Sequence, residues 1–145
     1  MQKVTLLGDS IRMIGYGKTV AEALNKEGIE VFQPEENCRF SKYTLRMLFD
    51  YKDQIEGSDV IHWNNGLWDV SDLFGDGQFT PTEEYCENML RIADVLLRIT
   101  PNVIFATTTP VRNNYPYQTA EDVKRLNDAI VPLLKARNIA INDLY

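Results

Sequence analysis

The sequence predicts an α/β fold in which one parallel sheet lies between two layers of helices. Two observations lead to this prediction. Short apolar runs of strand length alternate with longer segments of helical periodicity, and the order along the chain is βαβαβαβαβ. The 145 residues are the size of one domain, and 44% of them are hydrophobic, which is enough for a core. We therefore predict a single domain over residues 1–145.

Five short apolar segments, each followed by turn residues, are predicted to form the strands. They are residues 3–7, 29–32, 59–63, 103–107 and 139–141. Because a helix separates each strand from the next, the strands should run parallel with right-handed crossovers. The expected architecture is a flavodoxin-like, five-stranded α/β/α sandwich.

Four segments have the spacing of amphipathic helices. They are residues 18–26, 41–51, 80–98 and 119–137. Gly28 follows the first helix at the position where a left-handed residue is favoured. Thr80 with Glu83, and Thr119 with Asp122, have the spacing of capping pairs at the starts of the last two helices.

Composition excludes several classes of function. The formal charge is −6 and the basic residues do not cluster, which argues against a nucleic-acid or anionic-membrane partner. The two cysteines, Cys38 and Cys86, and the single histidine, His62, lack the spacing of a metal site. We expect no metal ion or organic cofactor. Isolated thiols and the lack of a leader-like N-terminus favour a cytoplasmic protein.

The loops after the strands are where a functional site is expected, because ligands bind outside the carboxyl ends of the strands in such sheets. The loop segments are residues 8–17, 33–40, 64–78 and 108–118. Residues 62–77 stand out, with two Asn, two Trp and three Asp within 16 residues. Asn side chains can donate to an oxyanion, and Trp rings can line a pocket. The loop 108–118 could form a lip of that pocket.

The first loop begins with a glycine, an aspartate and a serine directly after the first strand. Gly8 allows a sharp turn, and Ser10 would then lie near a helix N-terminus, where backbone N–H groups stabilise an oxyanion. Asp9 or Ser10 could equally do no more than cap the next helical turn. The tripeptide by itself is compatible with both interpretations.

Together these loops resemble the SGNH hydrolases, the GDSL-type family of esterases and lipases. The strongest motif is Gly8-Asp9-Ser10-Ile11 after the first strand. The resemblance implies that Ser10 is the nucleophile, with Asp9 beside it in the catalytic motif. In the stretch Asn37-Cys38-Arg39 the family has a glycine whose N–H helps to form the oxyanion hole, so Cys38 is the implied backbone donor.

The third family motif, Gly-x-Asn-Asp, matches residues 66–69, but Trp68 stands where the family has its asparagine. The side-chain donor to the oxyanion would then be Asn64 or Asn65, beside Gly66. We also expect three residues of this region to line the substrate pocket. They are Trp63, Trp68 and Asp69.

The fourth family motif, Asp-x-x-His near the C-terminus, supplies the general base and is not found in the sequence. The resemblance therefore implies a C-terminally truncated SGNH domain that lacks the final helix and the loop with the catalytic histidine. We expect His62 to have a structural role, since residues on a central strand point into the helical layers. We also expect the uncovered sheet face near Leu144 and Tyr145 to favour self-association.

The resemblance implies a serine ester hydrolase that acts on a short acyl ester, such as an O-acetyl group on a sugar. Without the Asp-x-x-His motif, the chain is expected to be a weak or inactive esterase. The alternative is a non-catalytic module on the same scaffold that binds a ligand or glycan. A nucleotide-binding role is less favoured, because the first loop lacks the P-loop lysine and the G-x-G-x-x-G spacing.

Overall fold

The structure is a computed structural model that describes residues 2–145. It contains one sheet of five parallel strands in the order β2-β1-β3-β4-β5, as the sequence predicts. The strands are β1 (Lys3–Leu7), β2 (Glu30–Phe32), β3 (Val60–Trp63), β4 (Val103–Ala106) and β5 (Ala140–Asn142). Each lies within two residues of its predicted bounds. The flavodoxin-like order is confirmed.

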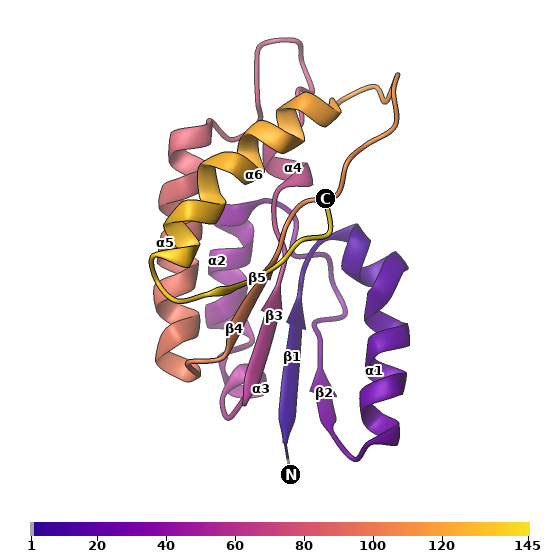
Figure 1. Ribbon diagram of the computed structural model, residues 1–145, viewed down its shortest axis with the longest axis vertical. Helices are drawn as coiled ribbons and strands as arrows, with labels where there is room; N and C mark the ends of the chain where they lie inside the picture. Colours follow the sequence, from indigo (N-terminus) through magenta and orange to yellow (C-terminus); the bar gives the residue numbers. More distant parts are fainter. Residues whose placement is uncertain (1) are drawn as a thin grey trace.

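Helices lie on both faces of the sheet, but unequally. The helices are α1 (Gly17–Lys26), α2 (Ser41–Asp50), α3 (Lys52–Ile55), α4 (Leu67–Val70), α5 (Thr82–Ile99) and α6 (Ala120–Lys135), and a π-helical segment over Ile11–Tyr16 precedes α1. Figure 1 shows α2, α5 and α6 together on one side of the sheet and α1 alone on the other. The three-layer prediction is confirmed.

Two of the three predicted helix-end signals are confirmed. Gly28 has a left-handed φ of 77° just after α1, and the Thr119 hydroxyl accepts the Asp122 N–H at the start of α6. The prediction that Thr80 caps α5 is wrong. Pro81 is the N-cap residue, and the Thr80 N–H donates instead to the Asp69 carbonyl at 3.0 Å.

The sheet face under α2, α5 and α6 is fully covered by packed side chains. Strand residues that point to this face, such as Ile61, Trp63 and Phe105, are fully buried. The Trp63 and Phe105 rings meet edge to face with their centroids 5.1 Å apart. This face forms the main hydrophobic core of the domain.

The face under α1 is only partly covered. Strand residues on this face line an apolar groove of about 380 Å³ with α1 and the end of the chain. The groove residues include Val4, Leu6, Val60, His62, Ile104 and Leu144. An incompletely covered apolar face next to Leu144 agrees with the sequence analysis, and self-association through it stays a prediction.

Two general properties bear on function. No helix within residues 2–145 combines the length and the apolar character that crossing a membrane requires. In the same residues, no three His, Cys, Asp or Glu side chains come together in a way that could hold a metal ion.

Candidate active site

Ser10 lies at the carboxyl edge of the sheet, immediately after the turn that ends β1. The Asp9 carbonyl accepts the N–H groups of Arg12 and Met13, each at 3.1 Å, and this starts the π-helical segment. Gly8 is required for the close approach in this turn, because a Cβ there would lie 2.9 Å from the Arg12 Cβ. π-Helical turns are rare and often occur at functional sites.

The buried Asp9 carboxylate stabilises this turn. Its side chain is fully buried, Oδ1 accepts the Ile11 N–H at 3.0 Å, and Oδ2 has no partner within residues 2–145. Burial raises the pKa of Asp9 to about 6, against the lowering effects of the Ile11 N–H and the Arg12 charge. Asp9 is absent from the lining of the cavity that contains Ser10, so it acts on the turn that carries the hydroxyl.

The Arg12 side chain links the first loop to the second, a role that the sequence analysis did not predict. Its guanidinium is buried and donates to the carbonyl oxygens of Gly8, Pro34 and Glu36 at 2.9–3.2 Å, and to the Gln33 amide oxygen at 3.1 Å. The only signal in the sequence is a lone arginine two residues after the serine.

Cys38 contacts the same turn through both its amide and its thiol. The Cys38 N–H donates to the Gly8 carbonyl at 3.1 Å, and Sγ accepts the Gly8 N–H at 3.3 Å. Burial raises the pKa of the Cys38 thiol. The amide that the resemblance assigns to the oxyanion hole is therefore already engaged, and this bond must break before Cys38 can donate to a substrate.

The two adjacent asparagines differ in how fully their side chains are engaged. The Asn65 Oδ1 accepts the Trp63 Nε1–H at 2.7 Å, and its Nδ2 donates to the Thr44 hydroxyl and the Arg39 carbonyl. The Asn64 Nδ2 makes one bond, to the Ala106 carbonyl at 2.9 Å. Because an amide nitrogen carries two hydrogens, Asn64 retains a donor hydrogen without a partner in residues 2–145, and Asn65 does not.

Gly66 and Asp69 hold the third loop in place. Gly66 has a φ of 157°, and a Cβ there would lie 2.0 Å from the Thr108 hydroxyl, so only glycine fits against this neighbour. Asp69 is fully buried, and its carboxylate accepts both the N–H and the hydroxyl of Ser41. Burial raises the pKa of Asp69, and its hydrogen bonds oppose this effect.

A cavity of about 400 Å³ opens beside Ser10. Its lining is formed by Ser10, Ile11, Leu67, Trp68, residues 109–112, Tyr115 and Gln118. Trp68 lines this cavity together with residues of the fourth loop, and its role in a substrate pocket stays a prediction. The placement of Trp63 and Asp69 in the pocket is wrong, because both side chains are fully buried elsewhere. Arg112, Tyr115 and Gln118 were not identified as site residues from the sequence.

His62 lies on the α1 face of the sheet, away from the Ser10 cavity. It lines the apolar groove, where its ring meets Tyr16 edge to face at 5.4 Å. Its Nε2 accepts the Asn142 Nδ2–H at 3.1 Å, and burial lowers its pKa. Within residues 2–145, no imidazole lines the cavity that contains Ser10.

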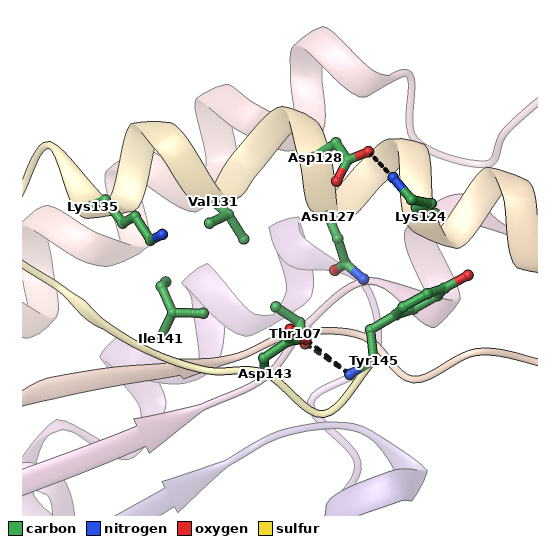
Figure 2. Close-up of a pocket in the computed structure, with 9 residues that line it drawn as sticks. All are labelled: Thr107, Lys124, Asn127, Asp128, Val131, Lys135, Ile141, Asp143 and Tyr145. Atoms are coloured by element: carbon green, nitrogen blue, oxygen red, sulfur yellow. Dashed lines mark hydrogen bonds and ion pairs between the residues drawn. The ribbon is translucent and has the colours of Figure 1, made fainter.

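A cavity of about 510 Å³ is a separate groove between α6 and the end of the chain. Figure 2 shows α6 on one side of this groove, with Lys124 and Asp128 paired along the helix, and Thr107, Asp143 and Tyr145 on the other side. Lys124 and Asp128 pair with each other at 2.7 Å, and the Thr107 hydroxyl donates to Asp143 and accepts the Tyr145 N–H. These groups are already paired, so the Ser10 cavity is the better candidate site.

Comparisons with known proteins show the fold. No protein-family profile matches the chain, and no curated protein matches it in sequence. The acetyl xylan esterase AlAXEase has 21% identity and a TM-score of 0.78, over 98% of this chain and 77% of its own. A GDSL-like lipase from Bacteroides thetaiotaomicron has 19% identity and a TM-score of 0.74, over 98% and 68%.

A third structure, the psychrotrophic esterase EstA from Pseudoalteromonas sp., has 14% identity and a TM-score of 0.73, over 99% of this chain and 77% of its own. The chain thus has the SGNH (GDSL-type) hydrolase fold that its motifs imply. At these identities the comparison establishes the architecture and leaves the chemistry to the residues of this chain.

Proposed function

We propose that this chain is a serine ester hydrolase of the SGNH type in which Ser10 attacks a short acyl ester, such as an O-acetyl group on a sugar. The observation that carries the proposal is the position of Ser10, at the carboxyl edge of the sheet and in the wall of a cavity of about 400 Å³. The solved structures that share this fold are named as acetyl xylan esterases, lipases and esterases, which supports the class of reaction.

In the proposed reaction, the Ser10 Oγ adds to the acyl carbonyl and the alcohol leaves, so that an acyl-enzyme forms. Water then attacks the acyl-enzyme and releases the acid. The negative charge on the tetrahedral oxygen needs nearby N–H donors. Of the side chains considered for this role, Asn64 alone retains a donor hydrogen within residues 2–145. Its side chain is buried and does not line the Ser10 cavity, so it must shift before it can donate to a substrate.

The proposed chemistry is slow in this chain, because no imidazole accepts the Ser10 proton in the cavity. Loss of the histidine of a catalytic triad costs on the order of 10⁴- to 10⁶-fold in the chemical step. We therefore expect the 145-residue chain to be a poor esterase. Water in the open cavity must accept the proton instead.

The test is acetylation of Ser10 by p-nitrophenyl acetate at mildly alkaline pH, followed by mass spectrometry of the peptide that contains Ser10. We expect one acetyl group on Ser10, together with slow release of p-nitrophenol. Ser10→Ala should abolish both, and Thr19→Ala, which removes an exposed hydroxyl from α1, should change neither. Acetyl groups only on other residues, or release at ordinary hydrolase rates, would contradict the proposal.

A non-catalytic binding module on the same scaffold is the second candidate. The observations that favour it are the engaged Cys38 amide and the position of His62 outside the cavity. Calorimetry with acetylated sugars separates the two candidates. Saturable binding without any acetylation of Ser10 favours the module, and acetylation of Ser10 favours the hydrolase.

A further inference from the structure

A second cavity, of about 250 Å³, adjoins the Ser10 cavity and shares Trp68, Tyr115 and Gln118 with it. We call this second cavity the aromatic groove. Its apolar lining consists of Trp68, Leu73, Phe79, Tyr115 and Tyr117, which come from the third and fourth loops. Each of these side chains is 39–50% exposed. Large apolar side chains that gather in one exposed place mark a surface with a binding role.

The aromatic groove is built on a rigid base. The Asp72 N–H donates to the Tyr117 carbonyl at 2.9 Å, and the Phe79 N–H donates to the Ser71 carbonyl at 2.7 Å. The first bond ties the third loop to the fourth, and the second closes the third loop on itself. The Phe79 ring also packs on Phe40, with their centroids 5.2 Å apart. These contacts hold the walls of the groove in place, so binding requires little ordering of the loops.

Gln118 places an unpaired hydrogen-bond acceptor between the two cavities. Its Nε2 donates to the Leu67 carbonyl at 3.2 Å and to the Ser71 hydroxyl at 2.6 Å. Because a carbonyl can only accept, the Leu67 contact fixes which end of the amide is the nitrogen. Oε1 is buried and has no partner within residues 2–145. A buried acceptor of this kind is stabilised by a ligand that brings a hydroxyl group.

We propose that the aromatic groove is a subsite for a pyranose ring of the alcohol part of the ester. The ring would stack its C–H face on the aromatic side chains and donate one hydroxyl to the Gln118 Oε1. This inference rests on the proposed function, since it assigns the carbohydrate end of a substrate whose acyl group lies at Ser10. A sugar meets both requirements of the groove at once, because it has an apolar face and a rim of hydroxyl donors.

The two tryptophans of the chain make the subsite directly measurable. Trp63 is fully buried in the core, and Trp68 is 39% exposed in the groove. A change in tryptophan emission on adding a sugar therefore reports Trp68. We use xylotriose and cellotriose as probes, on Ser10→Ala protein. Neither sugar carries an ester, so the titration does not depend on turnover.

We expect a saturable change in Trp68 emission with at least one of the two sugars. Tyr117→Ala, which removes a stacking ring, and Gln118→Leu, which removes the acceptor, should each weaken binding by about tenfold. The matched control is Phe74→Ala, because Phe74 is 83% exposed on the same loop and lines neither cavity. It should leave the affinity unchanged.

Three results would overturn the subsite. They are the absence of saturation with both sugars, equal weakening by Phe74→Ala, and tighter binding of 2-phenylethanol, an aryl alcohol without a ring of hydroxyls. These results are distinguishable from a failure of the proposed function. Acetylation of Ser10 without sugar binding would contradict only the proposed subsite. Sugar binding without acetylation of Ser10 would contradict only the proposed hydrolase activity.

Discussion

The two faces of the sheet differ in how completely their side chains are packed and hydrogen-bonded. Under α2, α5 and α6, strand residues such as Ile61 and Trp63 are fully buried, and the buried Asp69 carboxylate accepts bonds from Ser41. Under α1, an apolar groove stays open between the strands and the end of the chain. Figure 1 shows α2, α5 and α6 over the first face and α1 over the second.

Unpaired polar atoms follow the same division. The buried side-chain atoms without a hydrogen-bond partner in residues 2–145 are Asp9 Oδ2, Tyr16 Oη, His62 Nδ1, Asn64 Oδ1 and Gln118 Oε1. Tyr16 and His62 line the groove under α1, and Asn64 and the Tyr16 hydroxyl both approach Gly8. Buried polar groups without partners destabilise a fold. Four of these five atoms lie on the α1 face or in the turn above it, and the fifth, Gln118 Oε1, lies beside the third loop. On the face under α2, α5 and α6, which we call the three-helix face, strand residues such as Ile61 and Trp63 are fully buried.

The largest expected effect is a difference in stability between the same substitution on the two faces. Ile61 is fully buried on the three-helix face, and Ile104, on the neighbouring strand, lines the open groove. Ile61→Ala should lower the free energy of unfolding by about 2–5 kcal/mol, because it leaves a cavity in a dry core. Ile104→Ala should cost less than half as much.

Urea unfolding of both variants measures this difference, provided that the slope with denaturant stays the same. Equal losses of stability would contradict the contrast, since they would mean that the two faces are equally well packed.

The second prediction concerns Asp9, whose pKa is raised by burial from 3.8 to about 6. A carboxyl with a higher pKa in the folded state binds its proton more tightly there than in the unfolded state. Its contribution to stability is therefore complete below about pH 4 and is lost as the pH rises through about 6. The shift corresponds to roughly 3 kcal/mol.

Asp9→Asn removes this titration. Relative to the unsubstituted protein, the variant should gain stability between about pH 4 and about pH 7, by up to roughly 3 kcal/mol. Below about pH 4, the difference in free energy of unfolding between the variant and the unsubstituted protein contains only the other effects of the substitution. It therefore acts as an internal control. A difference that stays constant with pH would show that Asp9 is solvated in the folded protein.

The third prediction concerns self-association through the groove under α1. Leu144→Lys places a charge at the groove, where a partner copy would bury it. If copies associate there, the dissociation constant from sedimentation equilibrium should rise by about tenfold or more. The matched control is Ile14→Lys, because Ile14 is 87% exposed and lies outside the groove. A monomer at all concentrations, or equal effects of both variants, would contradict the expectation.

The strands and the loops between them could be predicted from the sequence, because local periodicity marks them. The flavodoxin-like strand order was expected from the alternation of strands and helices with right-handed crossovers. The position of Trp63 could also have been found in this way. It is two residues after Ile61 on β3, and alternate residues of a strand point to the same face, here the core. Its interpretation as a pocket residue gave too much weight to its nearness to the asparagines.

The partners of Cys38, Asn65 and Arg12 could not be predicted, because they depend on distances between segments that are far apart in the chain. The Cys38 amide meets Gly8, 30 residues earlier, and the Asn65 amide meets Thr44, 21 residues earlier. Such contacts arise only when parallel strands bring their loops together at one edge of the sheet. The SGNH resemblance therefore pointed to loops that meet at one edge of the sheet, without determining which N–H groups in them are free.

The smallest expected effect is that of His62→Gln on the reaction of Ser10. If His62 were the base, its removal would lower the rate of Ser10 acetylation by orders of magnitude. Its Nε2 instead accepts the Asn142 amide in the groove under α1, and it does not line the Ser10 cavity. The acetylation rate should therefore stay within about twofold of the unsubstituted rate across the pH range. A tenfold or greater loss of acetylation rate would show that His62 takes part in the reaction of Ser10. The assignment of His62 to a structural role on the α1 face would then be wrong.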